Sequence, residues 1–567
     1  MKTKRNSRFR KIIFWAIGIL IGILITIGAV GYFYWSKLIK GTLEEAVKRG
    51  TNGLYRAEIG NLYYGIFDGD LYIHNFSLLP DTAVYNTLNK TDSAPPSLIM
   101  LQVNNLEITD IGLKDAVFNR QARAAKIRIK LPELTIWRMK EPVKEATGKP
   151  GDTLLSIPLP EGWDFISIEE ISLEEGTLKY IDLTADTATE FCIPSFDIRI
   201  LNLRIDSTWE EDPRIYNTDN ILITLRGIRQ LTGNRMYAMN FGEIGLSTGK
   251  NTLLIKQFHL EPLFDKHDFS RKLGYQTDRM DIVVGSILLS GINLRELMQR
   301  KRFIAGKLQV DGLVLDDYRD KRVSMRPDYK PPMPQDLIRK LKPYIRIDTL
   351  ELTNGKATYS EQVVDEPGTI FFDRIHATLT GLTNDSAWLA ENRVSSLKGE
   401  AYLQGTGKLE AQVDFKFGDP KNRFTLSAFM STFDLRQINP MLSKLLPAEV
   451  KSGRINKLVV PRINFTDHVA TGRLTLYYEN LKFILFDEKQ TTWSGIKTEI
   501  INFVANDLTI PGRNPGANGK LRTGIVYFQR DKHKSIINFI WKSILSGVKS
   551  NIGLNSRDQK EIKKREK

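Results

Sequence analysis

The clearest fold signal in this chain is the stretch KLEAQVDFKF, residues 408–417. Its hydrophobic side chains occupy the odd positions from Leu409 to Phe417, and its charged or amide side chains occupy the even positions. Because successive side chains of a strand point to opposite faces, this alternation predicts a β-strand with one apolar and one hydrated face. Shorter stretches of the same kind occur at Leu71–Ile73, Ile127–Leu131, Leu308–Val310, Ile375–Leu379 and Leu474–Tyr478. We therefore expect a mostly β protein.

One of these stretches changes parity along its length. Its apolar positions are even-numbered from Leu474 to Tyr478 and odd-numbered from Leu481 to Leu485. A single strand keeps all of these side chains on one face only if an irregularity intervenes. The sequence therefore predicts a bulge, a bend or a turn near residues 479–480.

Two patterns recur within the chain. The segment from Ile168 to Tyr180 returns from Ile347 to Tyr359 at a constant offset of 179 residues. The matching positions are Ile168, Ile171, Leu173, Gly176 and Tyr180 in the first copy, and Ile347, Leu350, Leu352, Gly355 and Tyr359 in the second. An apolar segment, a glycine and a second segment with an aromatic residue are typical of a β-hairpin, which we expect in both copies.

The second recurring pattern joins residues 290–297 to residues 431–438. In each copy a polar residue, Asn293 or Asp434, precedes apolar side chains at helical spacing and can cap a short helix. We expect a third short helix from Gln335 to Leu341. Two independent pairs in the same order favour a repeated supersecondary unit in which short helices interrupt the strands.

The charge of the chain is concentrated at its ends. The 567 residues carry a formal net charge of +15, yet residues 1–11 contain six basic and no acidic side chains. The tail 557–567 carries a net +3, which leaves about +6 on the long middle. This distribution argues against a nucleic-acid partner, which would require a basic surface on the folded body. The single cysteine excludes an internal disulfide.

The segment from Ile12 to Trp35 is an apolar run of 24 residues without a charged side chain. It is long enough to cross a bilayer as a helix, and the preceding basic residues place the N-terminus in the cytoplasm. The alternative is a cleaved signal peptide, because small residues lie at Ala29 and Gly31. The length of the apolar run favours an uncleaved membrane anchor.

No catalytic motif is apparent. The chain lacks G-x-S-x-G, H-E-x-x-H, C-x-x-C and a complete phosphate loop. His259, Asp265, His267 and Asp268 are the closest approach to a metal-ligand group, but a polar surface loop explains them better unless a helix or hairpin brings the four side chains together. We therefore expect no enzyme activity, no metal and no cofactor.

A helix with an apolar stripe is predicted near the C-terminus, over residues 536–549. The stripe consists of Ile537, Ile540, Trp541, Ile544, Leu545 and Val548. Such a face must be buried against something. Two alternatives remain open: the helix closes the end of the β array, or it lies in a membrane interface beside the basic tail.

The order of these features resembles the AsmA-like family of envelope proteins, which belongs to the bridge-like lipid-transfer proteins built from repeating β-grooves. The likeness rests on the apolar segment 12–35 and on residues 57–62, 67–78, 347–359 and 472–481. The resemblance implies an inner-membrane anchor, a periplasmic body, and a role in phospholipid transport or outer-membrane homeostasis. It implies no catalytic residues.

Together these signals predict an N-terminal transmembrane helix followed by an elongated, curled antiparallel β-sheet with short helical inserts and a C-terminal amphipathic helix. Loops are expected at 86–96, 141–160 and 326–334, all on one continuous sheet. The expected segments are a cytoplasmic tail at 1–11, the membrane helix at 12–35, a helical connector at 36–54, β-groove repeats at 55–333 and 334–535, the amphipathic helix at 536–549 and a basic tail at 550–567.

A curled sheet of this kind offers an apolar floor for acyl chains and a polar rim for headgroups. The residues expected to line that floor are Leu409, Val413, Phe415, Phe417, Leu474 and Leu476. The expected partners are phospholipids, the inner membrane and other envelope proteins. The same alternation also fits a closed β-sandwich core, and the same extended surface also fits a non-catalytic envelope scaffold or assembly factor.

Overall fold

The computed structural model describes residue 41, residues 44–485 and residues 511–565, except 46, 65–68, 92, 113–114, 116–118, 141–158, 160–162, 185–188, 209–211, 213, 327 and 446–447. The predicted membrane helix, Ile12 to Trp35, lies outside these residues. Among the residues described, no helix is both long enough and apolar enough to cross a membrane. The predicted connector is helical at residues 47–50.

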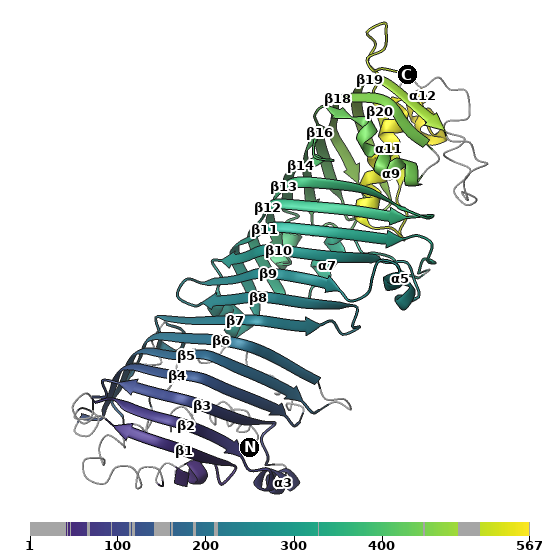
Figure 1. Ribbon diagram of the computed structural model, residues 1–567. Coiled ribbons are helices and arrows are strands. Elements are labelled where there is room, and N and C mark those ends of the chain that lie inside the picture. The colour runs from purple at the N-terminus through teal and green to yellow at the C-terminus, as the bar shows by residue number, and fades with distance from the viewer. Residues whose placement is uncertain are drawn as a thin grey trace. The chain divides into compact units, whose positions relative to one another are not determined.

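Strands dominate the described chain, as the alternation predicts (Figure 1). They are β1 (Tyr55–Tyr64), β2 (Leu71–Pro80), β3 (Ser97–Thr109), β4 (Gln121–Arg138), β5 (Phe165–Asp182), β6 (Thr189–Asp206), β7 (Asn220–Leu231), β8 (Tyr237–Ser247), β9 (Thr252–Pro262), β10 (Asp278–Ser290), β11 (Arg302–Asp320), β12 (Tyr344–Gln362), β13 (Pro367–Thr383), β14 (Val394–Leu403), β15 (Gly407–Lys416), β16 (Phe424–Met430), β17 (Phe433–Asp434), β18 (Ala448–Phe465), β19 (Val469–Leu485) and β20 (Gly524–Gln529). Hydrogen bonding assigns these strands to one sheet.

The helices are short, apart from one near the C-terminus. They are α3 (Thr82–Lys90), the 3₁₀ turn η1 (Ile215–Asn217), α5 (Asp268–Leu273), α6 (Leu294–Arg300), α7 (Pro334–Lys340), α8 (Ser386–Ala390), the 3₁₀ turn η2 (Leu435–Ile438), α9 (Asn439–Leu445), α11 (Ile536–Asn551) and α12 (Arg557–Arg565). The predicted caps are confirmed, because Asn293 accepts from Glu296 N at 3.0 Å and Asp434 accepts from Arg436 N at 2.9 Å. The expected loop at 86–96 is wrong in its first half, because Asp81 caps α3 and the helix continues to Lys90.

Most adjacent strands are antiparallel. Two pairs of adjacent strands are parallel: β4 with β5, and β11 with β12. A parallel pair cannot be joined by a tight turn and needs a crossover. Between β11 and β12 this crossover consists of residues 321–333 and α7, which explains the predicted proline-rich loop at 326–334. The predicted antiparallel sheet is therefore confirmed, with these two parallel pairs as exceptions.

The internal repeat is confirmed, but its structure differs from the predicted hairpin. The first copy lies within β5 and the second within β12, each the strand that follows a parallel crossover. Each strand continues through its glycine, and the register shifts around Gly176 and Gly355 mark a bulge instead of a turn. The left-handed conformation is taken by the preceding residues, Glu175 (φ 56°) and Asn354 (φ 54°). The repeat therefore extends over β3–β6 and β10–β13.

These bulges belong to lines of irregular residues that cross neighbouring strands. In β1 to β5 the line runs through Gly60, Asn75, Asn104, Leu131 and Glu175, each opposite the next in the strand register. Asn75, Leu131 and Glu175 have φ values between 50° and 58°. Such a residue shifts the alternation by one position, so that apolar side chains before and after it share a face.

The same arrangement crosses β10 to β13, where the line runs through Gly285, Gly312, Asn354 and Arg374. The predicted irregularity in β19 is also confirmed as a bulge, with Asn480 at φ 54° and a register shift opposite it. We call these irregular positions the parity-switch residues.

The chain divides into two compact units, which we describe separately. One comprises the described residues up to Gln230 with Phe241–Ile255 and Ile292–Lys301, and the other comprises Leu231–Asn240, Lys256–Gly291 and the described residues from Arg302 onward. The core of the first contains side chains from both sides of its parity-switch residues, for example Ile73 and Phe76 of β2. The core of the second is richest in aromatic residues and gathers β15, β16, β18, β19, β20 and α11.

Candidate functional site

The apolar face of β11 is less buried than the packed core of the second unit. On β11, Leu308 and Val310 precede Gly312, and Leu313 and Leu315 follow it. These four leucine and valine side chains are half-buried and belong to none of the buried clusters of the described residues. An apolar face in this state is available to a hydrophobic ligand.

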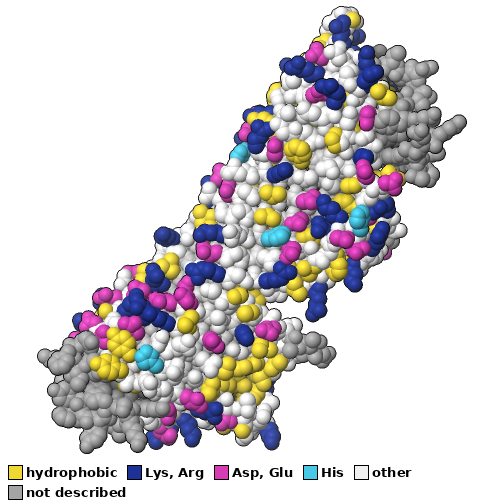
Figure 2. All heavy atoms as spheres, viewed as in Figure 1, with side chains coloured by type: hydrophobic (Ala, Val, Ile, Leu, Met, Phe, Trp, Pro, Cys, Tyr) yellow, Lys and Arg dark blue, Asp and Glu magenta, His cyan; other side chains and the backbone are white. Residues whose placement is uncertain are grey.

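The opposite face of the same strands is polar. Lys307 and Glu351 form an ion pair at 2.7 Å on one side of Gly312, and Asp316 pairs with Lys266 at 3.0 Å on the other. Basic and acidic side chains are interspersed on the face of the molecule that Figure 2 shows. On β11, the parity-switch residue Gly312 thus keeps the four apolar side chains on one face and Lys307 and Asp316 on the other.

The residues predicted to contact lipid lie elsewhere in the second unit. Val413, Phe415, Phe417, Leu474 and Leu476 are buried in the aromatic core, and Leu409 packs against it. Their surroundings are protein side chains: the rings of Phe424 and Phe465 stack with centroids 4.3 Å apart, and Phe539 of α11 meets Phe465 edge-on at 5.2 Å. Lipid contact at these six positions would therefore require the protein side chains packed around them to separate.

Helix α11 packs through small residues that the predicted stripe did not include. Its buried side chains are Phe539, Ser543, Gly547, Ser550 and Asn551. A Cβ at position 547 would lie 2.6 Å from side-chain atoms of both Leu474 and Val526, so a larger residue would force these packed side chains to move. Small residues three and four positions apart were the available sequence signal for this face.

The predicted stripe of α11 is divided between two environments. Ile540, Ile544 and Val548 pack against the aromatic core. Ile537 is 76% exposed and Trp541 is 55% exposed, and Leu545 is half-buried outside the core. The structure is therefore compatible with both predictions for this helix. One face of α11 packs against the end of the sheet, and the adjacent face exposes Ile537 and Trp541, which could enter a membrane interface.

α11 and α12 also cover the outer edge of β20. Ser550 Oγ accepts from Ile525 N at 2.9 Å, and Ser546 Oγ accepts from Tyr527 N at 3.3 Å. The amide of Gln559 donates to Ile525 O at 2.6 Å. Side chains of the helices thus replace the hydrogen bonds that another strand would make.

A group of charged residues ends the apolar face of β11. Positions 313, 315, 317 and 319 share one face, and the last two are Asp317 and Arg319. Arg319 binds Asp278 of β10 through two hydrogen bonds of 2.5 Å, and Lys321 pairs with Glu361 of β12 at 2.5 Å. The sequence analysis did not identify this group. A signal was present, because the odd-numbered positions of β11 change from leucine at 313 and 315 to charged residues at 317 and 319.

The electrostatics of this group reflect its burial. Burial, and then the neighbouring charge of Asp278, raises the pKa of Asp317 to about 7, and its Oδ1 has no hydrogen-bond partner among the described residues. Burial also raises the pKa of Tyr359, whose hydroxyl donates to Glu361 at 2.7 Å. Burial acts to lower the pKa of Arg319, but the hydrogen bonds to Asp278 and the charge of that carboxylate together raise it.

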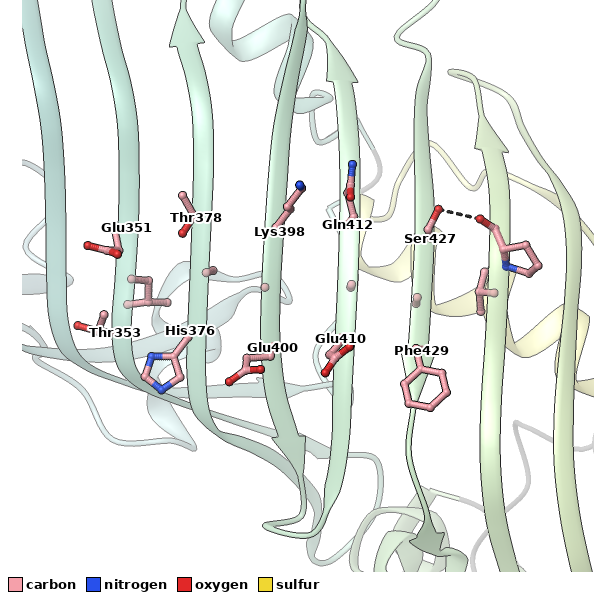
Figure 3. Close-up of a pocket in the computed structure, with 17 residues that line it drawn as sticks. Glu351, Thr353, His376, Thr378, Lys398, Glu400, Glu410, Gln412, Ser427 and Phe429 are labelled. Carbon is pink, nitrogen blue, oxygen red and sulfur yellow. Dashed lines mark hydrogen bonds between the residues drawn. The ribbon is translucent and has the colours of Figure 1, made fainter.

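A shallow trough of about 660 Å³ lies on the polar face of β12 to β18 (Figure 3). Its floor is formed by small residues in register, Ala377, Gly399, Ala411 and Ala428. Its walls are two rows of mostly polar side chains, with Glu351, Thr378, Lys398, Gln412 and Ser427 in one row and Thr353, His376, Glu400, Glu410 and Phe429 in the other. Glu400 and Glu410 both pair with Lys408, so the wall charges are largely compensated.

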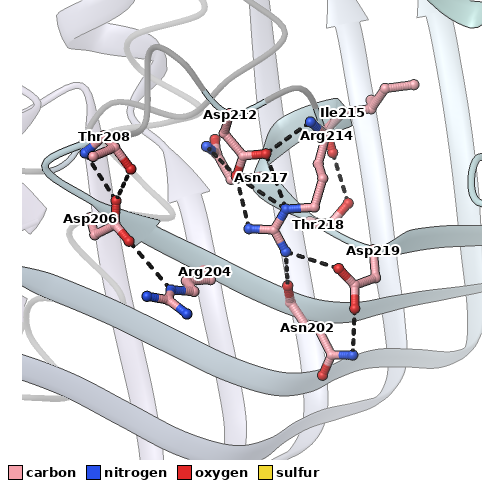
Figure 4. Close-up of polar contacts among 10 residues, drawn as sticks. All are labelled: Asn202, Arg204, Asp206, Thr208, Asp212, Arg214, Ile215, Asn217, Thr218 and Asp219. Atoms are coloured by element: carbon pink, nitrogen blue, oxygen red, sulfur yellow. Dashed lines mark hydrogen bonds and ion pairs between the residues drawn. The ribbon is translucent and has the colours of Figure 1, made fainter.

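A network around Arg214 fixes the loop between β6 and β7 in the first unit (Figure 4). The guanidinium binds Asp212 and Asp219 at 2.8 and 2.9 Å and donates to the carbonyl of Asn202 at 3.3 Å. Its bond to Asp212 raises the pKa of Arg214 above the ordinary value. Asn202 (φ 54°) is also held by Asp219, at 2.8 Å, so this left-handed residue is stabilised by the loop.

The possible metal ligands near residue 260 do not converge. His259 bonds to Asp281 at 2.8 Å, His267 faces Arg322 at 3.3 Å, and Asp265 accepts from the backbone at the start of α5. Within the described part of the chain, no three histidine, cysteine or acidic side chains are placed to hold a metal ion. Comparison with known proteins identifies no matching protein-family model and no matching curated protein.

Proposed function

We propose that this chain is a membrane-anchored, periplasmic lipid-binding or phospholipid-transfer protein of the AsmA-like kind that supports outer-membrane homeostasis. The observation that carries this proposal is the half-buried apolar face of β11, kept continuous by the parity-switch residue Gly312. The apolar segment 12–35 supports attachment to the inner membrane, with the N-terminus in the cytoplasm.

The apolar face of β11 is chemically suited to bind the acyl chains of a lipid. Acyl chains that leave water for the apolar face gain about 0.8 kcal/mol for each buried CH₂ group. Leu313 and Leu315 offer such a surface on β11, while the polar pairs Lys307–Glu351 and Asp316–Lys266 keep the other face in water. A sheet of this kind can hold a lipid without a closed cavity.

The C-terminal helix supports a second contact with membranes. Ile537 and Trp541 project from α11, and Lys542 beside them is exposed. Tryptophan and lysine at the edge of an apolar stripe suit a membrane interface. This contact would place α11, whose other face packs against the aromatic core, at the surface of a bilayer.

Site-specific photocrosslinking tests the lipid proposal directly. A photoreactive amino acid at Leu315 should crosslink phospholipid when the full chain is made in cells with an envelope. The same amino acid at Asp316, the next residue and on the opposite face, is the matched control and should not. Absence of lipid at 315 in a folded protein, or equal lipid at both positions, would exclude an apolar lipid face on β11.

The trough on the polar face favours a second candidate, a non-catalytic scaffold that binds other envelope proteins. Phe429 at its wall is 41% exposed, which is unusual for a strand face otherwise occupied by charged residues. Replacing Phe429 by Ser should then remove a protein partner from crosslinked complexes while lipid crosslinks at Leu315 persist. Unchanged protein complexes would remove the support for this candidate.

A further inference from the structure

The trough on the polar face of β12 to β18 is built periodically. Four successive strands each place one side chain in either wall: β13 contributes Thr378 and His376, β14 Lys398 and Glu400, β15 Gln412 and Glu410, and β16 Ser427 and Phe429 (Figure 3). Within each wall these side chains are direct neighbours in the strand register. Because adjacent strands lie about 4.8 Å apart, both walls repeat at that distance across the sheet.

This period selects among linear ligands. An extended chain of β-linked sugar rings has a repeat close to the distance between strands, so that successive rings meet equivalent positions on successive strands. A peptide running across the strands would advance about 3.3 Å for each residue and would fall out of step with the walls. The period of the trough therefore favours a glycan over a peptide.

The charges of the trough are balanced. The carboxylates of its walls are Glu351, Glu400 and Glu410, and the ammonium groups are Lys398 in the wall and the ion-pair partners Lys307 and Lys408. Three negative groups thus face three positive ones. A surface with this balance does not attract a polyanion such as nucleic acid and suits a ligand without net charge.

The walls also offer hydrogen-bonding groups beside an exposed ring. The Thr378 hydroxyl and the Lys398 ammonium group make no hydrogen bond to another described residue. The amide nitrogen of Gln412 donates to Asp414 at 2.9 Å, which leaves the amide oxygen as an acceptor. Phe429 is 41% exposed in the opposite wall. A sugar ring presents hydroxyl groups at its edge and C–H groups on its faces, so it can use both kinds of surface.

We propose that the trough binds an extended, uncharged segment of a β-linked glycan. Thr378, Lys398 and Gln412 hydrogen-bond to its hydroxyl groups, and Phe429 packs against the face of a ring. This inference goes beyond the proposed lipid function and uses the opposite face of the sheet. The glycan chains of a cell wall have this chemistry, and the proposed periplasmic location makes them the expected source.

The test uses chitohexaose, a β-1,4-linked hexamer of N-acetylglucosamine, and the full chain in a detergent without a sugar headgroup. Saturation-transfer NMR should detect binding of chitohexaose and not of maltohexaose, an α-linked hexamer that curls and does not match the strand spacing. Phe429→Ala should weaken binding about fivefold, because the contact with the ring is lost, and Phe429→Tyr should retain it. Tyr63→Ala, which removes an exposed ring of β1, is the matched control and should change nothing.

Gln412→Ala provides a second variant, in the wall opposite Phe429, and should also weaken binding severalfold. Absence of chitohexaose binding, equal binding of the two hexamers, or binding insensitive to both Phe429→Ala and Gln412→Ala would overturn the glycan site. Loss of a protein complex on Phe429→Ser, without glycan binding, would overturn it in favour of the scaffold. Lipid crosslinks at Leu315 report on the other face, so the lipid proposal stands or fails separately. Sedimentation with purified cell-wall sacculi, reversed by chitohexaose, would support the cell wall as the source.

Discussion

Gly176 of β5 faces the ring of Phe196 on β6 so closely that a Cβ at position 176 would lie 2.3 Å from the ring. The contact occurs at the bulge, where the register between β5 and β6 shifts on either side of Gly176. The ring therefore occupies the space that any other residue at 176 would need, and the absence of a side chain permits the bulge.

We expect Gly176→Ala to destabilise the protein by about 1–3 kcal/mol, because the ring of Phe196 must move in a packed site. Gly233→Ala is the control, since nothing lies within 4 Å of a Cβ there. Denaturant unfolding of the full chain in detergent measures both. If the two variants unfold at the same denaturant concentration, Phe196 has room to move and the bulge does not depend on glycine.

Asp317 should make stability depend on pH. Its pKa of about 7 in the folded protein lies above the ordinary value of 3.8, so the folded state keeps a proton that the unfolded chain has lost. Stability should therefore fall as the pH rises from about 4 to about 7, by up to a few kcal/mol, and change little above that. Asp317→Asn should be more stable than the unaltered protein at pH 8 and equally stable at pH 4.

Thermal unfolding at the two pH values checks this expectation. Asp316→Asn is the matched control, because Asp316 is the neighbouring carboxylate on the polar face and pairs with Lys266. A constant difference between Asp317→Asn and the unaltered protein at both pH values would contradict the assignment.

The two faces of α11 should respond differently to substitution. Phe539→Ala removes a buried ring from the aromatic core and should cost about 3–5 kcal/mol of stability. Trp541→Asp lies on the exposed face and should leave the unfolding midpoint within the range of surface substitutions. Its effect should appear instead in binding of the full chain to anionic vesicles, measured by flotation, where we expect a severalfold loss.

The network of Arg214 predicts a local effect. Arg214→Lys keeps the charge but loses the forked contact with Asp212 and Asp219, so the loop and Asn202 should be less well held. Hydrogen exchange should become faster in residues 202–219 and remain unchanged in β10 to β13. Uniform acceleration throughout the chain would show that the network contributes to global stability instead.

The sequence predicted those features that depend on the residue pattern of a single strand. Alternation at residues 408–417 predicts β15, and the change of parity between Tyr478 and Leu481 predicts the bulge at Asn480. The glycine in each repeat was misread as a turn, because a glycine after a left-handed residue can end a strand or bulge it, and only the neighbouring strand decides which.

The candidate site depended on contacts that a linear pattern does not contain. Arg319 and Asp278 are 41 residues apart, so no spacing rule links them. The stripe of α11 was visible at helical spacing, but which side of it would meet the sheet depended on the small residues Ser543 and Gly547. The packing of the six predicted lipid-lining residues likewise depends on strands and helices that are distant in sequence.

Ser546 and Ser550 of α11 hydrogen-bond to the free edge of β20 and so end the sheet at this strand. With Ser546, Ser550 and Gln559 occupying its backbone groups, β20 offers no template to a strand from another molecule. A chain cut before residue 536 would keep β20 and lose that cover, so we expect it to self-associate edge to edge into β-rich aggregates. α11 and α12 would then prevent polymerisation through the edge of β20 in addition to completing the fold.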